Sequence, residues 1–398
     1  MPPRRRRHGD VVTPFITGWA HGQFGKLPGE TLESLIVGVG AAAIEDAGLD
    51  PADIDEIYLG TFNAGLVPLA FASSLALQIS PALRHVPATR VENACASGSA
   101  AVLQGVKALQ AGSARNVLVI GAEKMTHAPS DAVGRALLGA DYESAGSESV
   151  TGFAGLFART AAIYEERYGP VGGPLAMIAA KSHRNGALNP FAHLRKPLTE
   201  EFCRTVSDRN PVVAAPLRRT DCSPVSDGAA ALVLSAQSSR NARHAPVRMM
   251  GMAQANDYLP WSERDPLAFA GSVQAWTRAL SAAGVSRDDL DLVEVHDCFT
   301  IAELIMYEVI GLTRRGEGRR AIEEGIVDRD GALPVNVSGG LKSKGHPVGA
   351  TGVSQHVMAS MQLTGTAGDM QLPNARRAAV HNMGGLAVAN YVSVLEAI

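Results

Sequence analysis

The sequence has few aromatic residues, no excess of either charge and no long apolar run. Phe, Trp and Tyr make up 5% of its 398 residues, and the formal net charge is −3. This charge does not indicate a nucleic-acid partner, and no run reaches the roughly 18 apolar residues of a membrane span. The arginine run at residues 4–7 is not followed by the apolar segment of a secretory signal. We therefore expect a cytoplasmic protein with neither a nucleic-acid nor a membrane partner.

Cysteine is also scarce. The four cysteines, Cys95, Cys203, Cys222 and Cys298, lie far apart and match no zinc-binding spacing. They are predicted to be free thiols, of which one or two are catalytic, and no metal site is expected.

An internal duplication is the most informative pattern in the chain. Residues 43–59 (AIEDAGLDPADIDEIYL) align without a gap with residues 279–295 (ALSAAGVSRDDLDLVEV). Each copy predicts an amphipathic helix that ends at a glycine, Gly48 or Gly284, and then a buried strand. A second pair of strands is predicted downstream, at residues 116–121 and 378–380. Alternating helices and strands favour parallel α/β units, so we expect two similar halves related by a pseudo-twofold axis.

The halves are predicted to span residues 1–238 and 245–398. Residues 122–216 fit the repeat poorly, because they contain Pro- and Gly-rich loops, a predicted helix at 156–168 and many cations. We interpret this segment as an excursion from the first half that covers a ligand. The stretch DGAAALVL (227–234) then predicts a return to a buried strand.

Cys95 is the strongest candidate for a nucleophile. It lies in VENACASGS (91–99), where a strand, a small-residue turn and a helix follow one another. The partial positive charge at a helix N-terminus favours the reactive thiolate, and the small neighbours leave room for a substrate carbonyl. Taken alone, the motif is also compatible with an inert buried cysteine.

His346 lies in a glycine-rich loop, VSGGLKSKGHPVGATG (337–352), which is the counterpart of the Cys95 loop in the second half. If a twofold relates the halves, the two loops face each other. An imidazole then meets a thiol, as a nucleophile–base pair requires.

Two further motifs follow predicted strands of the second half. In HDCF (296–299), His296 can donate to an oxyanion and Cys298 can exchange a proton. In HNMGG (381–385), the backbone N–H of Gly384 is expected to point into the site, because an oxyanion hole needs fixed donors. A plain strand end explains each motif when it is taken alone.

Together these motifs resemble those of the thiolases over nearly the whole chain. The Cys95 loop resembles the nucleophile loop of the family, GHP (345–347) its histidine motif, and SDGAAA (226–231) the close of its inserted loop domain. Two departures place the chain near the sterol-carrier-protein type. HDCF stands where common thiolases have Asn-Glu-Ala-Phe, and Asn382-Met383-Gly384 stands where they have Cys-x-Gly. The stretch at residues 181–196 resembles the same group.

The resemblance implies an α/β protein with five layers, αβαβα, built from two duplicated halves with an inserted loop domain. It further implies that Cys95 carries the acyl group, that His346 activates it and that Cys298 moves protons. His346, together with His296 and a bound water, also stabilises one oxyanion, and backbone N–H groups of Cys95 and of Gly384, which follows Asn382 in the HNMGG segment, hold the other.

Coenzyme A is implied as a co-substrate, with no bound cofactor. Acyl-CoA and CoA are the expected small-molecule partners, and a homodimer or homotetramer is the expected assembly. The phosphates of CoA are expected to meet the cations gathered in or beside the excursion: Lys181, Arg184, Arg218 and Arg219.

Two other functions stay open at this point. Cys95, His296 and His346 are similar to the Cys-His-His set of decarboxylating condensing enzymes, so a condensing enzyme or an aldolase without thiolysis is one alternative. A non-enzymatic subunit that binds acyl-CoA is the other, although loss of the nucleophile would be its signature and Cys95 is present.

Overall fold

A computed structural model describes residues 12–238 and 241–398, so the arginine run at residues 4–7 lies outside the described residues. Nine strands form one sheet in the order β3-β2-β4-β7-β1-β8-β11-β10-β9. The first half of the chain contributes β1 (Phe15–His21), β2 (Glu56–Gly60), β3 (Ala88–Val91), β4 (Asn116–Glu123) and β7 (Gly228–Ser235). The second half contributes β8 (Val247–Asn256), β9 (Leu292–Glu294), β10 (Arg377–Gly384) and β11 (Ala389–Ala397).

The two halves join where β1 pairs with β8 through only two residue pairs. Outward from β1 and β8, the strand orders of the two halves correspond to each other. β7 and β11 come first, then β4 and β10, and then β2 and β9. This is the pseudo-twofold arrangement that the internal duplication predicted.

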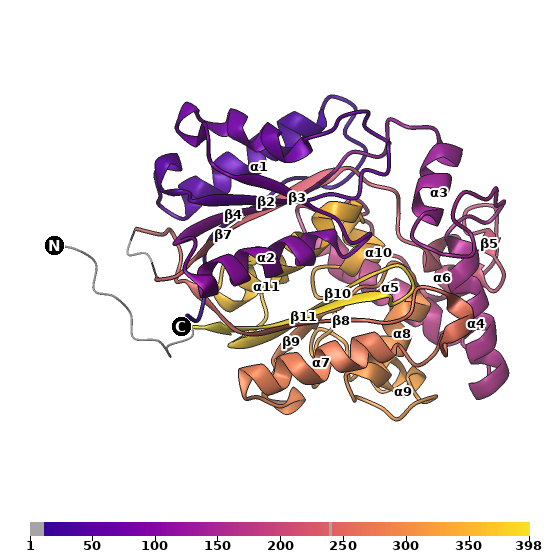
Figure 1. The fold of residues 1–398 in the computed structure, drawn as a ribbon. Helices are drawn as coiled ribbons and strands as arrows, with labels where there is room; N and C mark the ends of the chain where they lie inside the picture. The colour runs from indigo at the N-terminus through magenta and orange to yellow at the C-terminus, as the bar shows by residue number, and fades with distance from the viewer. Residues whose placement is uncertain (1–11, 239–240) are drawn as a thin grey trace.

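Helices cover and separate the two blocks of strands (Figure 1). α1 (Leu32–Asp46) lies outside the first block, and α7 (Ala270–Ala283) and α8 (Thr300–Val309) lie outside the second. Between the blocks lie α2 (Ser97–Ala111) and α11 (Thr351–Leu363). The five-layer αβαβα fold is therefore confirmed, as is the α/β class.

The repeated units have the predicted helix ends. α1 and α7 are followed by Gly48 and Gly284 at φ +63° and +67°, a conformation that glycine adopts without a steric penalty. The strands that follow, β2 and β9, pair in parallel with β4 and β10.

The sheet is mixed, however, rather than parallel throughout. β10 and β11 are joined by a short turn and must run antiparallel, and β4–β7, β1–β7, β1–β8 and β8–β11 are antiparallel as well. Within the described residues, only the pairs β2–β3, β2–β4 and β9–β10 follow the parallel expectation.

The excursion forms α3 (Ser130–Leu138), α4 (Ala154–Tyr168), α5 (Gly172–Leu188), α6 (Glu200–Arg204), β5 (Val212–Ala214) and β6 (Leu217–Arg218). α3, α4 and α6 gather at one end of the layers, on the right of Figure 1. The helix predicted at residues 156–168 is most of α4. Two short helices of the second half, α9 (Arg319–Glu323) and α10 (Gly340–Lys344), complete the fold.

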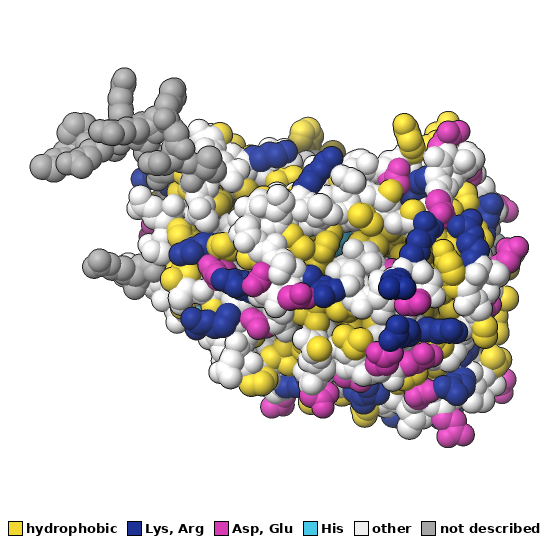
Figure 2. Space-filling view, turned by 90° about the horizontal axis from the view of Figure 1, so that it is seen from below, with side chains coloured by type: hydrophobic (Ala, Val, Ile, Leu, Met, Phe, Trp, Pro, Cys, Tyr) yellow, Lys and Arg dark blue, Asp and Glu magenta, His cyan; other side chains and the backbone are white. Residues whose placement is uncertain are grey.

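The described surface agrees with the small net charge. On the face seen from below the layers, Lys and Arg side chains are interspersed with Asp and Glu side chains (Figure 2). No helix within residues 12–238 and 241–398 is long and apolar enough to cross a membrane.

The two central helices touch backbone to backbone at their N-terminal ends. A Cβ added to Gly98 in α2 would lie 2.8 Å from the carbonyl oxygen of Gly349 and 2.8 Å from the nitrogen of Val353. A Cβ added to Gly352 in α11 would lie 2.3 Å from the nitrogen of Ser99. Neither contact leaves room for a side chain, so the loops that precede the two helices are held close together.

Replacing Gly98 with Ala should therefore lower the stability of the protein. Overpacking a rigid contact costs about 1–3 kcal/mol or more, and the atoms that would be struck belong to the backbone. Gly38 in α1 is the matched control, because it is exposed and an added Cβ meets nothing within 4 Å. Gly38→Ala should instead stabilise the helix by about 0.5–1 kcal/mol. Thermal unfolding monitored by circular dichroism checks both, and equal midpoints for the two variants would contradict the tight contact.

Candidate active site

Cys95 lies in a fixed turn between β3 and α2. Ala94 before it has a φ of +50°, a strained conformation that the surroundings must hold. The hydroxyl of Ser97 accepts from the Asn93 N–H at 2.9 Å and donates to the Ala94 carbonyl at 2.6 Å. The Asn93 side chain donates to Tyr391 Oη across the halves at 2.6 Å. The buried sulfur of Cys95 is thereby placed where the halves meet.

Three side chains from distant segments converge at this sulfur. Cys95, His296 and His346 each offer one ligand-type atom within 4.8 Å of those of the other two, and all three residues are buried. The rings of His296 and His346 meet edge to face, with centroids 5.1 Å apart. The two loops expected from the duplication to face each other do so.

The hydrogen bonds of His346 leave one ring nitrogen free to act as a base. Thr351 Oγ1 donates its only hydrogen to the Pro347 carbonyl at 3.0 Å, so it accepts from His346 Nδ1, 2.7 Å away. The hydrogen of the neutral imidazole is therefore on Nδ1, and Nε2 keeps its lone pair. That nitrogen is the one that can take the proton of Cys95.

Burial controls the protonation of this pair. Desolvation raises the pKa of Cys95 to about 12, although the backbone N–H groups of Gly385 and Cys95 oppose the rise; the charge of Glu123 adds to it. Desolvation, with help from Lys344, lowers the pKa of His346 to about 3. Desolvation thus opposes the thiolate that the helix N-terminus was expected to favour. The resting pair is a neutral thiol beside a neutral imidazole.

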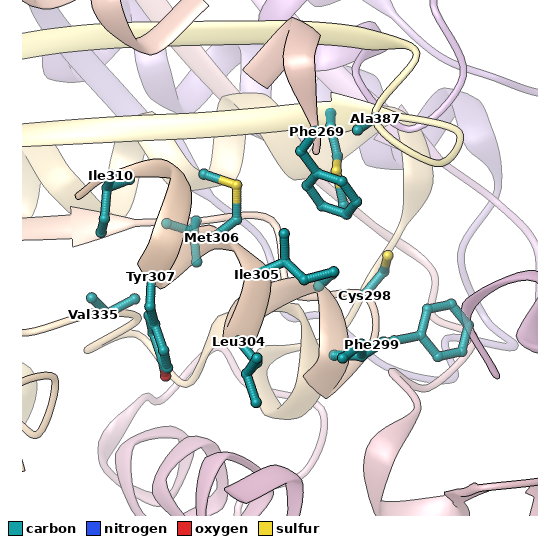
Figure 3. Packing of buried hydrophobic residues seen from close by; sticks show 14 of the residues in the cluster. Phe269, Cys298, Phe299, Leu304, Ile305, Met306, Tyr307, Ile310, Val335 and Ala387 are labelled. Carbon is teal, nitrogen blue, oxygen red and sulfur yellow. The ribbon is translucent and has the colours of Figure 1, made fainter. Parts of the chain in front are cut away.

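Cys298 lies at the entrance to α8, whose Leu304, Ile305, Met306 and Tyr307 lie in the surrounding apolar core (Figure 3). The segment that follows the excursion also holds it, because the N–H of Ser223 donates to the Cys298 carbonyl at 2.9 Å. Burial raises the pKa of the Cys298 thiol well above its usual value, and the charges of Cys95 and Asp297 add to the rise. Cys298 is therefore a protonated thiol at rest.

A cavity of about 1,040 Å³ opens onto these groups, and Cys95, Cys298 and His346 all line it. Much of its wall comes from α3 and from residues 148–154 and 222–225, so the excursion and the segment after it cover the cavity. Its apolar lining residues include Met125, Val133, Leu137, Phe153, Phe299 and Val348. Such a wall suits a ligand with a long apolar part.

Two of the predicted phosphate-binding cations are engaged elsewhere. Lys181 is 1% exposed and makes a buried ion pair with Glu303, and its ammonium also donates to the Val335 carbonyl. Arg218 is 5% exposed and pairs with Asp221 at 2.9 Å. Neither can reach a ligand without leaving a carboxylate buried and unpaired, so the expectation is corrected for these two residues.

The other two cations are nearer to solvent. Arg184 pairs with Asp328 at 3.1 Å on the surface and is not part of the cavity wall. Arg219 is exposed, three residues before the lining segment that begins at Cys222. Arg135 in α3 lines the cavity and was missed from the sequence. Its only sequence signal is its position within the excursion.

The HNMGG segment lies directly beside Cys95. A Cβ added to Gly384 would lie 2.4 Å from the Asn93 carbonyl oxygen, so Gly384 packs against the turn of the nucleophile loop. The backbone hydrogen bond that reaches the sulfur comes from the next residue, Gly385. The Asn382 side chain donates from Nδ2 to the Cys95 carbonyl at 3.2 Å and to His296 Nδ1 at 2.9 Å.

Fold and site together define a duplicated α/β protein with a buried cluster of one cysteine and two histidines, next to a cavity that a second thiol also lines. Residues 13–238 match the thiolase N-terminal domain, and residues 253–397 match the thiolase C-terminal domain-like family. An acetyl-CoA acetyltransferase of Methanothermobacter thermautotrophicus is 38% identical over 93% of this chain and 96% of its own length. The chain belongs to the thiolase family.

Other relatives agree with this membership. An acetyl-CoA acetyltransferase of Methanocaldococcus jannaschii is 37% identical over 85% of the chain and 87% of its own length. Human sterol carrier protein 2 is 30% identical over 87% of the chain, which spans 64% of that protein.

Solved structures share the fold at lower identity. An Ltp2-ChsH2(DUF35) aldolase has a TM-score of 0.79 at 23% identity, covering 97% of this chain and 98% of its own. Human mitochondrial 3-ketoacyl-CoA thiolase has a TM-score of 0.71 at 19% identity, covering 98% and 100%.

The protonation of Cys95 can be tested by alkylation. Only the thiolate reacts with iodoacetamide, and a raised pKa means that the thiolate is gained only as the pH rises toward about 12. The rate at Cys95, followed by peptide mass mapping, should rise about tenfold per pH unit up to roughly pH 10 without a plateau. A peptide of residues 91–99 is the control and should level off near its ordinary pKa of about 8.5. A plateau at Cys95 below neutral pH would instead indicate a preformed thiolate–imidazolium pair.

Proposed function

We propose that this chain is an acetyl-CoA C-acyltransferase of the thiolase type. It cleaves a 3-oxoacyl-CoA with CoA to acetyl-CoA, or propionyl-CoA, and a shortened acyl-CoA, or runs the reverse Claisen condensation. The observation that carries the proposal is the convergence of Cys95, His296 and His346 within 4.8 Å, next to a cavity that Cys95, His346 and Cys298 line. The acetyl-CoA acetyltransferases at 38% and 37% identity support the same activity.

The first half-reaction transfers the acyl group to Cys95. His346 Nε2 takes the thiol proton while the sulfur attacks the 3-keto carbon of the substrate. The C2–C3 bond then breaks, and Cys298 donates its proton to the carbanion of the departing acetyl-CoA. A raised pKa suits this step, because it keeps Cys298 protonated until a strong base forms beside it.

The second half-reaction returns both protons. The Cys298 thiolate left by the first step deprotonates the incoming CoA thiol, whose sulfur attacks the acyl group on Cys95. Cys95 leaves as a thiolate and recovers its proton from the His346 imidazolium. Every group is then back in its resting state, and a neutral resting pair is compatible with this cycle.

Two oxyanions need donors during these steps. His296, with a bound water, is proposed to hold the thioester oxygen of the departing acetyl-CoA. Backbone N–H groups are proposed to hold the 3-keto oxygen, namely that of Cys95 and one from the Gly384–Gly385 turn. Fixed donors of this kind stabilise charge that develops in the transition state.

The likeness to the aldolase fold keeps one alternative, a carbon–carbon lyase without thiolysis. An aldolase would release its product without an acyl-Cys95 intermediate and without consuming CoA. Product analysis with acetoacetyl-CoA, with and without free CoA, separates the two reactions.

Coenzyme A is a co-substrate in this proposal, and no bound cofactor is required. A cytoplasmic homodimer or homotetramer is part of the same proposal. Self-association is supported by Leu69 and Phe71, which are 42% and 85% exposed and precede β3 at the edge of the sheet.

Cys298→Ala should separate the two half-reactions. Acetyl-CoA should still acetylate Cys95, as intact mass and peptide mapping can show, because His346 is unchanged. Thiolysis of acetoacetyl-CoA should fall by roughly two to four orders of magnitude, the span expected when an acid/base group is lost. Cys203→Ala is the control, since Cys203 is buried in α6 and is not among the cavity-lining residues. Near-native thiolysis in Cys298→Ala would contradict the proton-transfer role, and acetylation that persists in Cys95→Ser would contradict the nucleophile.

The phosphate-binding proposal now rests on Arg135 and Arg219. Arg135→Ala and Arg219→Ala should each raise the KM for CoA by about 3–10-fold, equivalent to about 1 kcal/mol of binding. The KM for a pantetheine thioester without phosphates should change less. Arg184→Ala is the matched control and should leave both values near those of the unmodified protein. Equal effects on CoA and pantetheine substrates would count against phosphate contact.

A further inference from the structure

We propose that Asn382 is a positioning residue that holds His296 in the tautomer with its hydrogen on Nε2. In this tautomer the free nitrogen donates into the site and cannot act as a metal ligand. The donor role toward a substrate oxygen rests on the proposed function, whereas the tautomer and its effect on metal binding do not.

The orientation of the Asn382 amide follows from its two partners. One side-chain atom of Asn382 lies 3.2 Å from the Cys95 carbonyl oxygen, which can only accept, so that atom is the amide nitrogen. The same nitrogen lies 2.9 Å from His296 Nδ1. An NH₂ group has two hydrogens to donate and no lone pair to offer, so Nδ1 must accept. The hydrogen of the neutral His296 ring is therefore on Nε2.

The N–H on Nε2 is left for a ligand. His296 is fully buried, and Nε2 has no hydrogen-bond partner within the part of the chain that the structure describes. Buried donors are rarely left unpaired in folded proteins. Since His296 meets His346 edge to face and both lie close to Cys95, the free N–H belongs to the site rather than to the core.

The same three side chains have the chemistry of a metal site. A thiolate with two imidazoles is a donor set that Zn²⁺ and Co²⁺ accept, and one atom of each side chain lies within 4.8 Å of the others. Metal binding through His296 needs a lone pair on Nε2, and hence a hydrogen on Nδ1. That hydrogen would face the amide hydrogens of Asn382. If the amide turned over, its oxygen would instead face the Cys95 carbonyl oxygen.

Asn382 therefore determines whether the cluster of Cys95, His296 and His346 presents a hydrogen-bond donor or a set of metal ligands. With the amide in place, the cluster keeps one base on His346 and one donor on His296. Without it, the His296 ring is free to present a lone pair, and the cluster becomes a three-ligand metal site with an open position.

Two variants test this proposal. Asn382→Ala removes the amide that donates to His296 Nδ1. Asn382→Asp replaces that amide with a carboxylate that accepts from Nδ1–H, as carboxylates behind metal-bound histidines do. The purified wild-type protein and both variants are titrated with Co²⁺, and absorption from a thiolate-bound tetrahedral ion is recorded. We expect this absorption in the variants at Co²⁺ concentrations where the wild type shows none. Adding Cys95→Ser to Asn382→Ala is the matched control and should abolish it.

Two further readouts separate positioning from a loss of folding. ¹⁵N NMR of labelled histidines, with His296 assigned by its loss in His296→Gln, should show the hydrogen on Nε2 in the wild type. Under chelating conditions, kcat for thiolysis in Asn382→Ala should fall by about 10²-fold with KM for the acyl-CoA changed only a few-fold, as expected when an oxyanion donor is misplaced. Circular dichroism establishes that both variants are folded before they are compared.

The outcomes are distinguishable from those of the proposed function. Wild-type protein that binds Co²⁺ as tightly as the variants, or an Nδ1-protonated His296, would overturn the tautomer lock even if thiolysis is fast. An absence of thiolysis in the wild type would overturn the proposed function, yet the cobalt and NMR results would still decide the role of Asn382.

Discussion

The geometry of the site depends on one contact, the meeting of α2 and α11 without side chains between them. Gly98, Gly349 and Gly352 bring the two backbones so close that an added Cβ would overlap main-chain atoms. Cys95 lies in the turn that leads into α2, which begins at Ser97, and His346 lies in the loop that leads into α11, which begins at Thr351. Because each helix also packs on the block of strands from its own half, the contact fixes the distance between Cys95 and His346, which lie 251 positions apart in the sequence.

A buried carboxylate reinforces this junction. Glu123, at the end of β4, accepts from the backbone N–H groups of Phe62 and Asn63 in the first half and of Gly349 in the second, at 2.8–2.9 Å. Because the site is buried, neither a thiolate on Cys95 nor an imidazolium on His346 is favoured at rest. Burial raises the pKa of Glu123 as it does that of Cys95, and it lowers the pKa of His346.

The sequence predicted those features of the fold that depend on neighbouring residues in the chain. The helix ends at Gly48 and Gly284, and the strands that follow, could be identified because each repeat carries its own periodicity and its own left-handed glycine. The meeting of Cys95 with His346 followed from the duplication alone. The antiparallel pairing of β1, β7, β8 and β11 could not be predicted, because it depends on which strands become neighbours in the folded protein.

The sequence also could not predict which individual Lys and Arg side chains are buried in ion pairs and which are exposed. Arg218 pairs with Asp221, three residues away, but Lys181 pairs with Glu303, 122 residues away. Nothing in the local pattern distinguishes such buried cations from exposed ones such as Arg219. By the same logic Thr351, which sets the tautomer of His346, has no signal other than its position at the start of a helix. Whether a charged group or a hydroxyl forms its hydrogen bonds inside the core or remains available to a ligand therefore depends on partners that are distant in the sequence.

The two departures from the common thiolase motifs are best understood as one change. An amide at residue 382 cannot exchange a proton, but it can donate twice, and it uses both hydrogens to join the Cys95 carbonyl to His296 Nδ1. That bond requires a histidine at the end of β9, where common thiolases have an asparagine. The same segment then places a thiol, Cys298, two residues further on and at the cavity. Compared with the common thiolase motifs, a thiol is therefore absent at the end of β10 and present just beyond the end of β9. The residue that stands in its former place, Asn382, is hydrogen-bonded to His296 instead.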